Sequence, residues 1–223
     1  MGYTHYYYVE PHLDPDMFKK VVRDFKKMLP VFEKLDIQLR DGYGNPDKAP
    51  IVTASKIVFN GNEKCGHEER NLGITWPSKK AKGVCMAHTT SAPEDRDTII
   101  TQLTGEQESL AVGDSDVEGA WFAGCELNQR TCGGDCSHET FRLERDFKPE
   151  SWQEPKENGK YFECTKTAYK PYDLAVNCVL IIAKHHLGKQ ITVHSDGEIE
   201  QWQDSMQICQ NVLGYGNEFE FDD

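Results

Sequence analysis

The sequence predicts an α/β or α+β fold: a single compact domain with a mixed sheet and a helix buried over it. The first observation is the βαβα order over residues 160–213, where strand-like and helix-like segments alternate. The second is the start of the chain, where an alternating aromatic segment precedes an amphipathic one. The third is composition, because 38% hydrophobic residues in a chain of 223 can build a substantial core.

The N-terminal elements are indicated by spacing and by end signals. Residues 2–9 alternate and are rich in tyrosine, which is typical of a strand. A helix is predicted next, because Asp14 suits an N-cap, Pro15 suits the first helical position, and apolar residues recur at helical spacing as far as Pro30. The segment KIVFNG (56–61) is predicted to be a strand that ends in a turn.

The middle of the chain has a different character. Between residues 62 and 135 the composition shifts toward Gly, Lys, Asp, Glu, Ser and Thr, without sustained periodicity. We therefore expect one domain over 1–223, within which 62–135 forms an insertion or a loop layer.

Regular structure is predicted again after the insertion. The expected elements are a strand at 138–147, a strand at 160–168, a helix at 171–187, a strand at 191–195 and a helix at 199–213. The helix at 171–187 is apolar almost all round, begins at Pro171 and is followed by Gly188. These features predict that it is buried against the sheet.

Charge limits the classes of partner. Asp and Glu number 37 against 25 Lys and Arg, for a net charge of -12, so the whole molecule does not attract a phosphate backbone. A nucleic-acid partner needs a local basic patch, and the outer side of the first helix offers one, namely Lys19, Lys20, Arg23, Lys26 and Lys27. The alternative is a solvated helix face. Without a membrane-spanning segment or a signal peptide, we expect a cytoplasmic protein that does not bind membranes.

Cysteine and histidine residues form a metal-like pattern in and around the insertion. Its members are Cys65, His67 and Glu68, followed by Cys125, Cys132, Cys136 and His138. Thiolates and imidazoles at short loop spacing suit tetrahedral zinc. However, the two-residue gaps of common zinc motifs are missing, so we favour loop thiols or an adventitious disulfide and assign no metal ligand.

Three further segments carry candidate catalytic or binding groups. His138 and Glu139 are consecutive in a predicted strand, so only one of them can face a pocket. Cys164 and Lys166 share a strand face just before the buried helix, whose first turn contains Asp173. The alternative is that this segment is a packed strand with a purely structural role. A third group, at the tip of the last strand, consists of Ser195, Asp196 and the nearby Trp202.

The strand-tip group has two interpretations. Ser195 and Asp196 either cap the following helix or present a hydroxyl and a carboxylate to a substrate. The chain has no GxSxG, P-loop or GxGxxG motif, which removes the commonest hydrolase, kinase and dehydrogenase classes.

Several segments resemble known proteins. They are GYTHYYY (2–8), VFNG (58–61), SHETF (137–141), CTKTAYKPYD (164–173) and SDGE (195–198) with Trp202. Together they resemble a family of uncharacterised bacterial and phage proteins that begin with a GYTHYW-like segment. The resemblance covers both ends but not the middle, and a tyrosine stands at the Trp position. In size and general character the chain is also similar to the fungal arginine-containing cyclodipeptide synthases.

The second resemblance implies a tRNA-dependent cyclodipeptide synthase that joins arginine and a second amino acid from charged tRNAs. The aminoacyl ester is already activated, so no cofactor is expected. His5 or His138 would transfer protons, Ser195 or Cys164 would carry an acyl group, and Lys166 would assist Cys164. A carboxylate from Glu139, Asp173 or Asp196 would bind the guanidinium, with Trp202 nearby. The basic helix would hold the tRNA acceptor stem.

Two alternatives remain open at the level of sequence. One is a non-catalytic binding module stabilised by a metal bound to the Cys/His loops. The other is a metal-dependent nuclease or hydrolase that uses His67, His138 and Glu139. Chelation separates these two from the tRNA-dependent synthase, whose own reaction should survive it.

Overall fold

The computed structural model describes residues 3–67, 75–76, 120–122, 125–127, 130–132, 134–156 and 158–222. The strands are β1 (Thr4–Val9), β2 (Leu39–Arg40), β3 (Ile51–Val52), β4 (Lys56–Gly61), β5 (Thr75–Trp76), β6 (Ala120–Phe122), β7 (Cys125–Leu127), β8 (Arg130–Thr131), β9 (Phe141–Glu144), β10 (Tyr161–Lys166) and β11 (Ile191–Ser195). The helices are α1 (Pro15–Lys34), α3 (Asp173–Leu187) and α4 (Gln203–Leu213), with short 3-10 turns η2 (Gly188–Gln190) and η3 (Ile199–Trp202).

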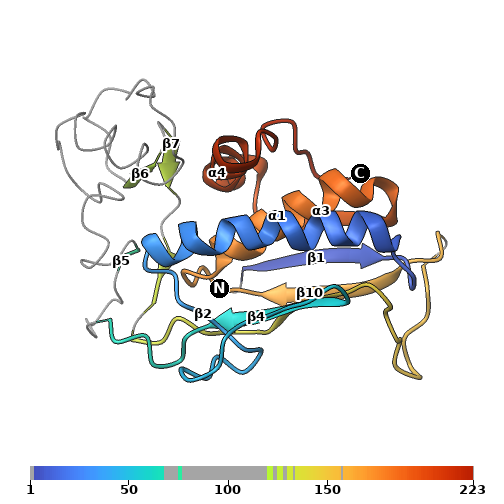
Figure 1. The fold of residues 1–223 in the computed structure, drawn as a ribbon, viewed down its shortest axis with the longest axis horizontal. Helices are drawn as coiled ribbons and strands as arrows, with labels where there is room; N and C mark the ends of the chain where they lie inside the picture. The colour runs from blue at the N-terminus through green and yellow to red at the C-terminus, as the bar shows by residue number, and fades with distance from the viewer. Residues whose placement is uncertain are drawn as a thin grey trace.

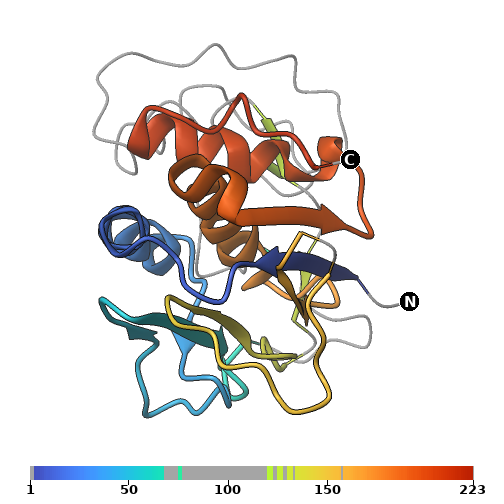
Figure 2. The same ribbon diagram turned by 90° about the vertical axis from the view of Figure 1, so that its right-hand side faces the viewer.

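These elements confirm the predicted fold class. Helices α1, α3 and α4 gather on one side of the molecule, and the strands β1, β10 and β4 lie beneath them (Figures 1 and 2). One sheet has the order β10-β1-β11, and a second has the order β2-β4-β3 with β9 also paired to β4. Neighbouring strands in both sheets are antiparallel, so the described strands form antiparallel sheets in place of the predicted mixed sheet.

Helix α1 begins as predicted and ends later. The carboxylate of Asp14 accepts hydrogen bonds from the backbone N–H groups of Asp16 and Met17, both at 2.9 Å, and so caps the helix. The helix does not stop at Pro30 but continues to Lys34. Pro30 is exposed, so water can bond the backbone carbonyl that its missing N–H leaves unpaired. Val31 and Phe32 then extend the buried face, which favours continuation.

Helix α3 forms the centre of the core. Twelve of its fifteen residues are buried, which confirms the buried helix predicted from its apolar composition. It starts at Asp173, two residues after the predicted start, and Gly188 terminates it with a positive φ of 55°. The helix packs against α1, α4 and β11, so its N-terminal turn is held rigidly beside the β10-β1-β11 sheet.

Most of the remaining elements are shorter in the structure than predicted, or are divided into two. The strands expected at 138–147 and 160–168 become β9 and β10, and the expected helix at 199–213 is divided into η3 and α4. The strand β11 has the predicted bounds of 191–195. Of the expected insertion at 62–135, the structure describes the two ends and three short strand pieces in between.

Candidate functional site

The β10-β1-β11 sheet brings polar residues from distant parts of the sequence onto one face. β1 is the central strand, and its register places His5 opposite both Thr165 and Ser195. Residues 5, 7 and 9 of β1 are buried while residues 4, 6 and 8 are half-buried, so His5 points into the core. The first turn of α3 packs against this inner face and supplies Asp173.

His5 connects Ser195 to Asp173 by two hydrogen bonds. Its Nε2 lies 2.7 Å from Oδ1 of Asp173, and its Nδ1 lies 3.0 Å from Oγ of Ser195. Since a carboxylate only accepts, we assign the Nε2–H tautomer, which leaves Nδ1 to accept from the Ser195 hydroxyl. The N–H of Gly197 donates to the same Oγ at 3.1 Å. The serine hydroxyl is therefore aligned on a base whose opposite nitrogen is held by an acid, the geometry that activates a nucleophile.

Asp173 is an ionised carboxylate in the protein interior. Thr167 donates its hydroxyl to Oδ1 at 2.5 Å, and Nε of Arg130 donates to Oδ2 at 3.0 Å. Burial alone would raise the pKa of Asp173, but the charges of Arg130 and His5 and its hydrogen bonds lower this pKa to about 2. Asp173 can thus orient the His5 ring through the hydrogen bond to Nε2.

Arg130 supplies the positive charge at this site. Its side chain is 1% exposed, and its Nη1 lies 2.5 Å from Oδ2 of Asp204, so the guanidinium joins two buried carboxylates. Within the described ranges, its Nη2 atom, Nε1 of Trp202 and Oδ1 of Asn177 are buried without a hydrogen-bond partner. Trp202 meets the His5 ring edge-on at 5.0 Å, and Asn177 approaches Asp173. Unpaired buried polar atoms near the base are typical of a place where water or a substrate group binds.

Other predicted site residues lie on the outer face of the same sheet. Cys164 is opposite Tyr6 in the register, whereas His5 is opposite Thr165, so Cys164 and Ser195 face opposite sides. Partial desolvation and the nearby carboxylates of Glu139 and Glu163 raise the pKa of the exposed Cys164 thiol, which disfavours the reactive thiolate. The structure thus separates the two candidate nucleophiles and brings only Ser195 to a base.

Asp196 is exposed and belongs to the outer side as well. Its carboxylate accepts from the backbone N–H of Thr4 at 3.0 Å and from the Tyr6 hydroxyl at 2.8 Å. It adjoins Ser195 in sequence but takes no part in the His5 chain of hydrogen bonds. Trp202, predicted as a substrate contact, is fully buried.

The remaining predicted catalytic residues lie around the turn before β9. His138 and Glu139 are both exposed, and the backbone of His138 is anchored by the Asn60 side chain. The Glu139 carboxylate accepts from the backbone N–H of Lys166 at 2.8 Å. These contacts fix the turn next to the end of β10 and do not join the Ser195–His5–Asp173 group.

The basic side chains of α1 are exposed except for Lys20, which is half-buried. Arg23 and Lys27 both pair with Asp24, a buried carboxylate that also contacts His186 and Tyr215. Lys19 pairs with Asp16, but both side chains are more than half exposed, so this pair contributes little and can exchange partners. Of the predicted patch, Lys19, Lys20 and Lys26 are therefore best placed to meet a phosphate group.

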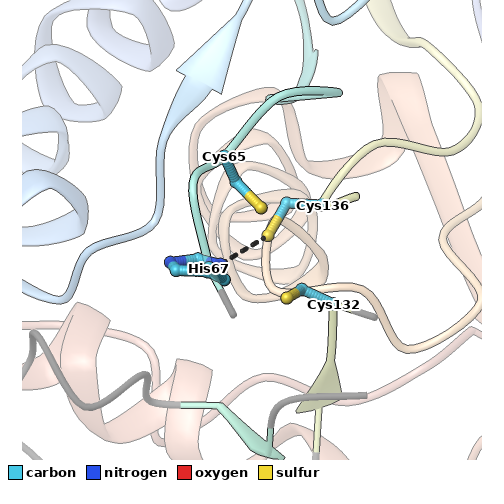
Figure 3. Close-up of side chains that lie close together, drawn as sticks. All are labelled: Cys65, His67, Cys132 and Cys136. Carbon is cyan, nitrogen blue, oxygen red and sulfur yellow. Dashed lines mark hydrogen bonds between the residues drawn. The ribbon is translucent and has the colours of Figure 1, made fainter. Parts of the chain in front are cut away.

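A second polar group lies where the insertion leaves and rejoins the core. Cys65 and His67 follow β4, while Cys132 and Cys136 follow β8, and Figure 3 shows these four side chains close together. One donor atom from each lies within 4.8 Å of all the others, and all four residues are buried. His67 takes the place that the sequence pattern offered to His138. Two members of the predicted pattern, Glu68 and the side chain of Cys125, lie outside the described residues.

Sequence reasoning missed Arg130, Thr167 and Asp204. Arg130 lies in the irregular segment, where no periodicity marks it as buried, and its two acidic partners are 43 and 74 residues away. Asp204 lies in the first turn of the amphipathic helix α4 and resembles an ordinary first-turn acid. A buried charge is recognisable only once its partner is known.

Comparison with known proteins gives no family for this chain. No protein-family model matches it, and no curated protein or solved structure shows significant similarity. In the part of the chain that the structure describes, no helix is both long enough and apolar enough to cross a membrane.

Proposed function

We propose that this protein is an aminoacyltransferase that joins arginine and a second amino acid from aminoacyl-tRNAs into a diketopiperazine. The observation that carries the proposal is the Ser195–His5–Asp173 chain of hydrogen bonds, at 3.0 and 2.7 Å. Ser195 is half-buried, so a substrate can reach it, while His5 and Asp173 are shielded from water. A serine aligned on a histidine base suits attack on an activated ester.

The reaction follows from this alignment. Ser195 Oγ attacks the ester carbonyl carbon of the first aminoacyl-tRNA, and its proton passes to Nδ1 of His5. The ester bond breaks, and the ribose oxygen of the leaving tRNA takes that proton. The amine of the second aminoacyl-tRNA then attacks the acyl group on Ser195, which releases the serine hydroxyl and leaves a dipeptidyl-tRNA. Attack of the free amine on the remaining ester closes the ring and releases the second tRNA.

The charge distribution supports the choice of substrate. Asp196 presents an exposed carboxylate on the outer side of the sheet, one residue after Ser195, and Glu139 presents another beside the end of β10. We propose that the substrate guanidinium reaches one of these two carboxylates around the end of the sheet. Asp173 is less suited, because the guanidinium of Arg130 already occupies it. The net charge of -12 favours a cationic amino acid, while Lys19, Lys20 and Lys26 offer a local contact for the acceptor stem.

A second candidate function is a non-catalytic binding module stabilised by a metal, and the Cys65–His67–Cys132–Cys136 group favours it. The metal-dependent hydrolase loses support from the same group. Four protein donors fill a tetrahedral ion, so no position is left for a reactive water. His138 and Glu139, which that mechanism also needs, lie outside the group.

A reconstituted assay distinguishes the two candidates. The protein is incubated with total tRNA, synthetases, ATP and all amino acids, with labelled arginine, and products are identified by mass spectrometry. We expect a labelled diketopiperazine that disappears with ribonuclease. The variant Ser195→Ala should lose at least about 100-fold in rate, whereas Cys164→Ala, the other candidate nucleophile, should retain activity.

Two outcomes of this assay would reject the proposed reaction or its mechanism. If no arginine-containing product forms while Arg-tRNA is shown to be present, the synthase proposal is rejected. If product forms equally well with Ser195→Ala at an unchanged melting temperature, the mechanism through Ser195 is rejected while the reaction stands.

A further inference from the structure

The Cys65, Cys132, Cys136 and His67 side chains meet across the base of the insertion. Cys65 and His67 follow the end of β4, where the insertion begins. Cys132 and Cys136 follow β8, where the insertion ends. Their exposed fractions are 3%, 1% and 2% for Cys65, Cys132 and Cys136, and 8% for His67. The three thiols are free, so the structure brings them together without a disulfide bond.

The donor set has the chemistry and the spacing of a zinc site. Three sulfur atoms and one imidazole nitrogen are ligands that zinc prefers in structural sites. A tetrahedral ion with bonds of about 2.3 Å to sulfur holds its sulfur atoms about 3.8 Å apart. The four donor atoms here all lie within 4.8 Å of one another, which needs only a small contraction around an ion.

Residues around the donors orient them as ligands. Nε2 of His67 lies 3.1 Å from Oδ2 of Asp36, which directs Nδ1 toward the three sulfur atoms, 3.2 Å from Sγ of Cys136. A carboxylate behind a ligating histidine is the usual outer partner at zinc sites. Asp36 itself has a φ of 56°, a conformation that follows the end of α1 and is unusual for a residue other than glycine.

The loops that carry the cysteines are shaped to surround an ion. Gly66 and Gly134 have positive φ values of 72° and 88°, which lets each loop turn tightly between its ligands. The N–H of Gly134 points at Sγ of Cys132 at 3.4 Å, a contact that stabilises a thiolate.

We propose that this protein binds one zinc ion through Sγ of Cys65, Nδ1 of His67, Sγ of Cys132 and Sγ of Cys136. All four positions are filled by the protein, so the ion is structural. It joins the two ends of the insertion and fixes the chain that leads to Arg130. Cys132 is two residues from Arg130, and the ammonium group of Lys170 bonds the backbone carbonyls of Cys132 and Asp135 at 2.7 and 2.5 Å. The zinc loop is thereby attached to the turn that precedes Asp173.

The first test is the metal content of the wild-type protein, purified without a metal-affinity tag and under reducing conditions. We expect about one zinc per chain by elemental analysis. Replacement by cobalt should give the intense visible bands of a tetrahedral ion and a sulfur-to-metal charge-transfer band. A mercurial reagent that titrates thiolates should release zinc to a chromogenic chelator. These measurements need no variant, so they do not depend on whether a mutant folds.

Variants then assign the ligands. Cys132→Ser and His67→Ala should each lower the zinc content at least about five-fold, while His67→Cys should retain it by forming a four-cysteine site. Cys164→Ser is the matched control, because that exposed thiol lies outside the group, and its zinc content should equal that of the wild type. Less than about 0.1 zinc per chain in the reduced wild-type protein, iron in place of zinc, or zinc retained by Cys132→Ser would overturn the proposal.

Discussion

Replacement of Arg130 by methionine tests whether the buried ion-pair group holds the site together. The guanidinium is 1% exposed and joins Asp173 and Asp204, which are 1% and 0% exposed. Methionine keeps much of the side-chain volume but leaves both carboxylates without their cation. Loss of one partner from a buried ion pair typically costs about 3–5 kcal/mol. For a chain of this size we therefore expect the melting temperature to fall by about 6–20 °C.

The same substitution should change the pH dependence of stability. In the wild type the pKa of Asp173 is lowered from 3.8 to about 2, which corresponds to about 2 kcal/mol of stability. That contribution is present above pH 4 and is lost as the pH falls toward 2. Without Arg130, we expect burial to outweigh the remaining contributions of His5 and Thr167 and to raise the pKa of Asp173 above its ordinary value. The folded variant then binds a proton more tightly than the unfolded chain, so its deficit should shrink as the pH falls from 7 to 4.

Urea denaturation at pH 7, 5.5 and 4, followed by tryptophan fluorescence, measures this difference. The control is Arg145→Met, because Arg145 pairs with Asp146 at the surface and its loss should change the stability little at every pH. If Arg130→Met costs no more than the control at pH 7, the buried ion-pair group does not hold the site together. A deficit that stays constant down to pH 4, while the control behaves as expected, would show that the loss of Arg130 does not raise the pKa of Asp173.

Three further outcomes are expected. Gly61→Ala should destabilise the fold by about 1–3 kcal/mol and reduce zinc binding, because the added Cβ would overlap the backbone carbonyl of Cys136. Urea denaturation measures the loss of stability, and elemental analysis measures the zinc content. Asp24→Asn should lower the melting temperature at pH 7, because hydrogen bonds from Arg23 and Lys27 outweigh burial and lower the pKa of Asp24. The variant should also lose less stability than the wild type as the pH falls below about 4, and an equal loss in the two proteins would contradict this. Replacing both Lys20 and Lys26 by Gln should weaken aminoacyl-tRNA binding and reduce its salt slope by about 2, whereas an unchanged slope rules out this face.

The sequence predicted the elements whose signals are local. The buried α3 and the strand β11 were found because an unbroken apolar run and a short β-branched run need no knowledge of distant residues. The later end of α1 was missed because a proline on an exposed helix face costs less than one facing the core.

The candidate site was predicted only in part, because local sequence signals do not show which distant residues meet in the fold. His5, Asp173 and Ser195 were all named as candidates, but their association depends on strand pairing between residues 190 positions apart. Nothing in the residues themselves separates them from His138 or Cys164, which the fold places elsewhere. The Cys/His group was likewise visible as a pattern, yet choosing His67 over His138 requires knowing which loop approaches β4.

The order β10-β1-β11 has a consequence for biosynthesis. Along the described part of the chain, the central strand β1 is made before both of its neighbours, β10 and β11, so β1 must wait for partners that are still untranslated. At about 5–20 residues per second, roughly 10–40 s separate the synthesis of His5 from that of Ser195. During this interval a tyrosine-rich strand has both edges unpaired, which exposes it to aggregation or makes it a target for chaperones. The β10-β1-β11 sheet can therefore form on the ribosome only after β11 has emerged.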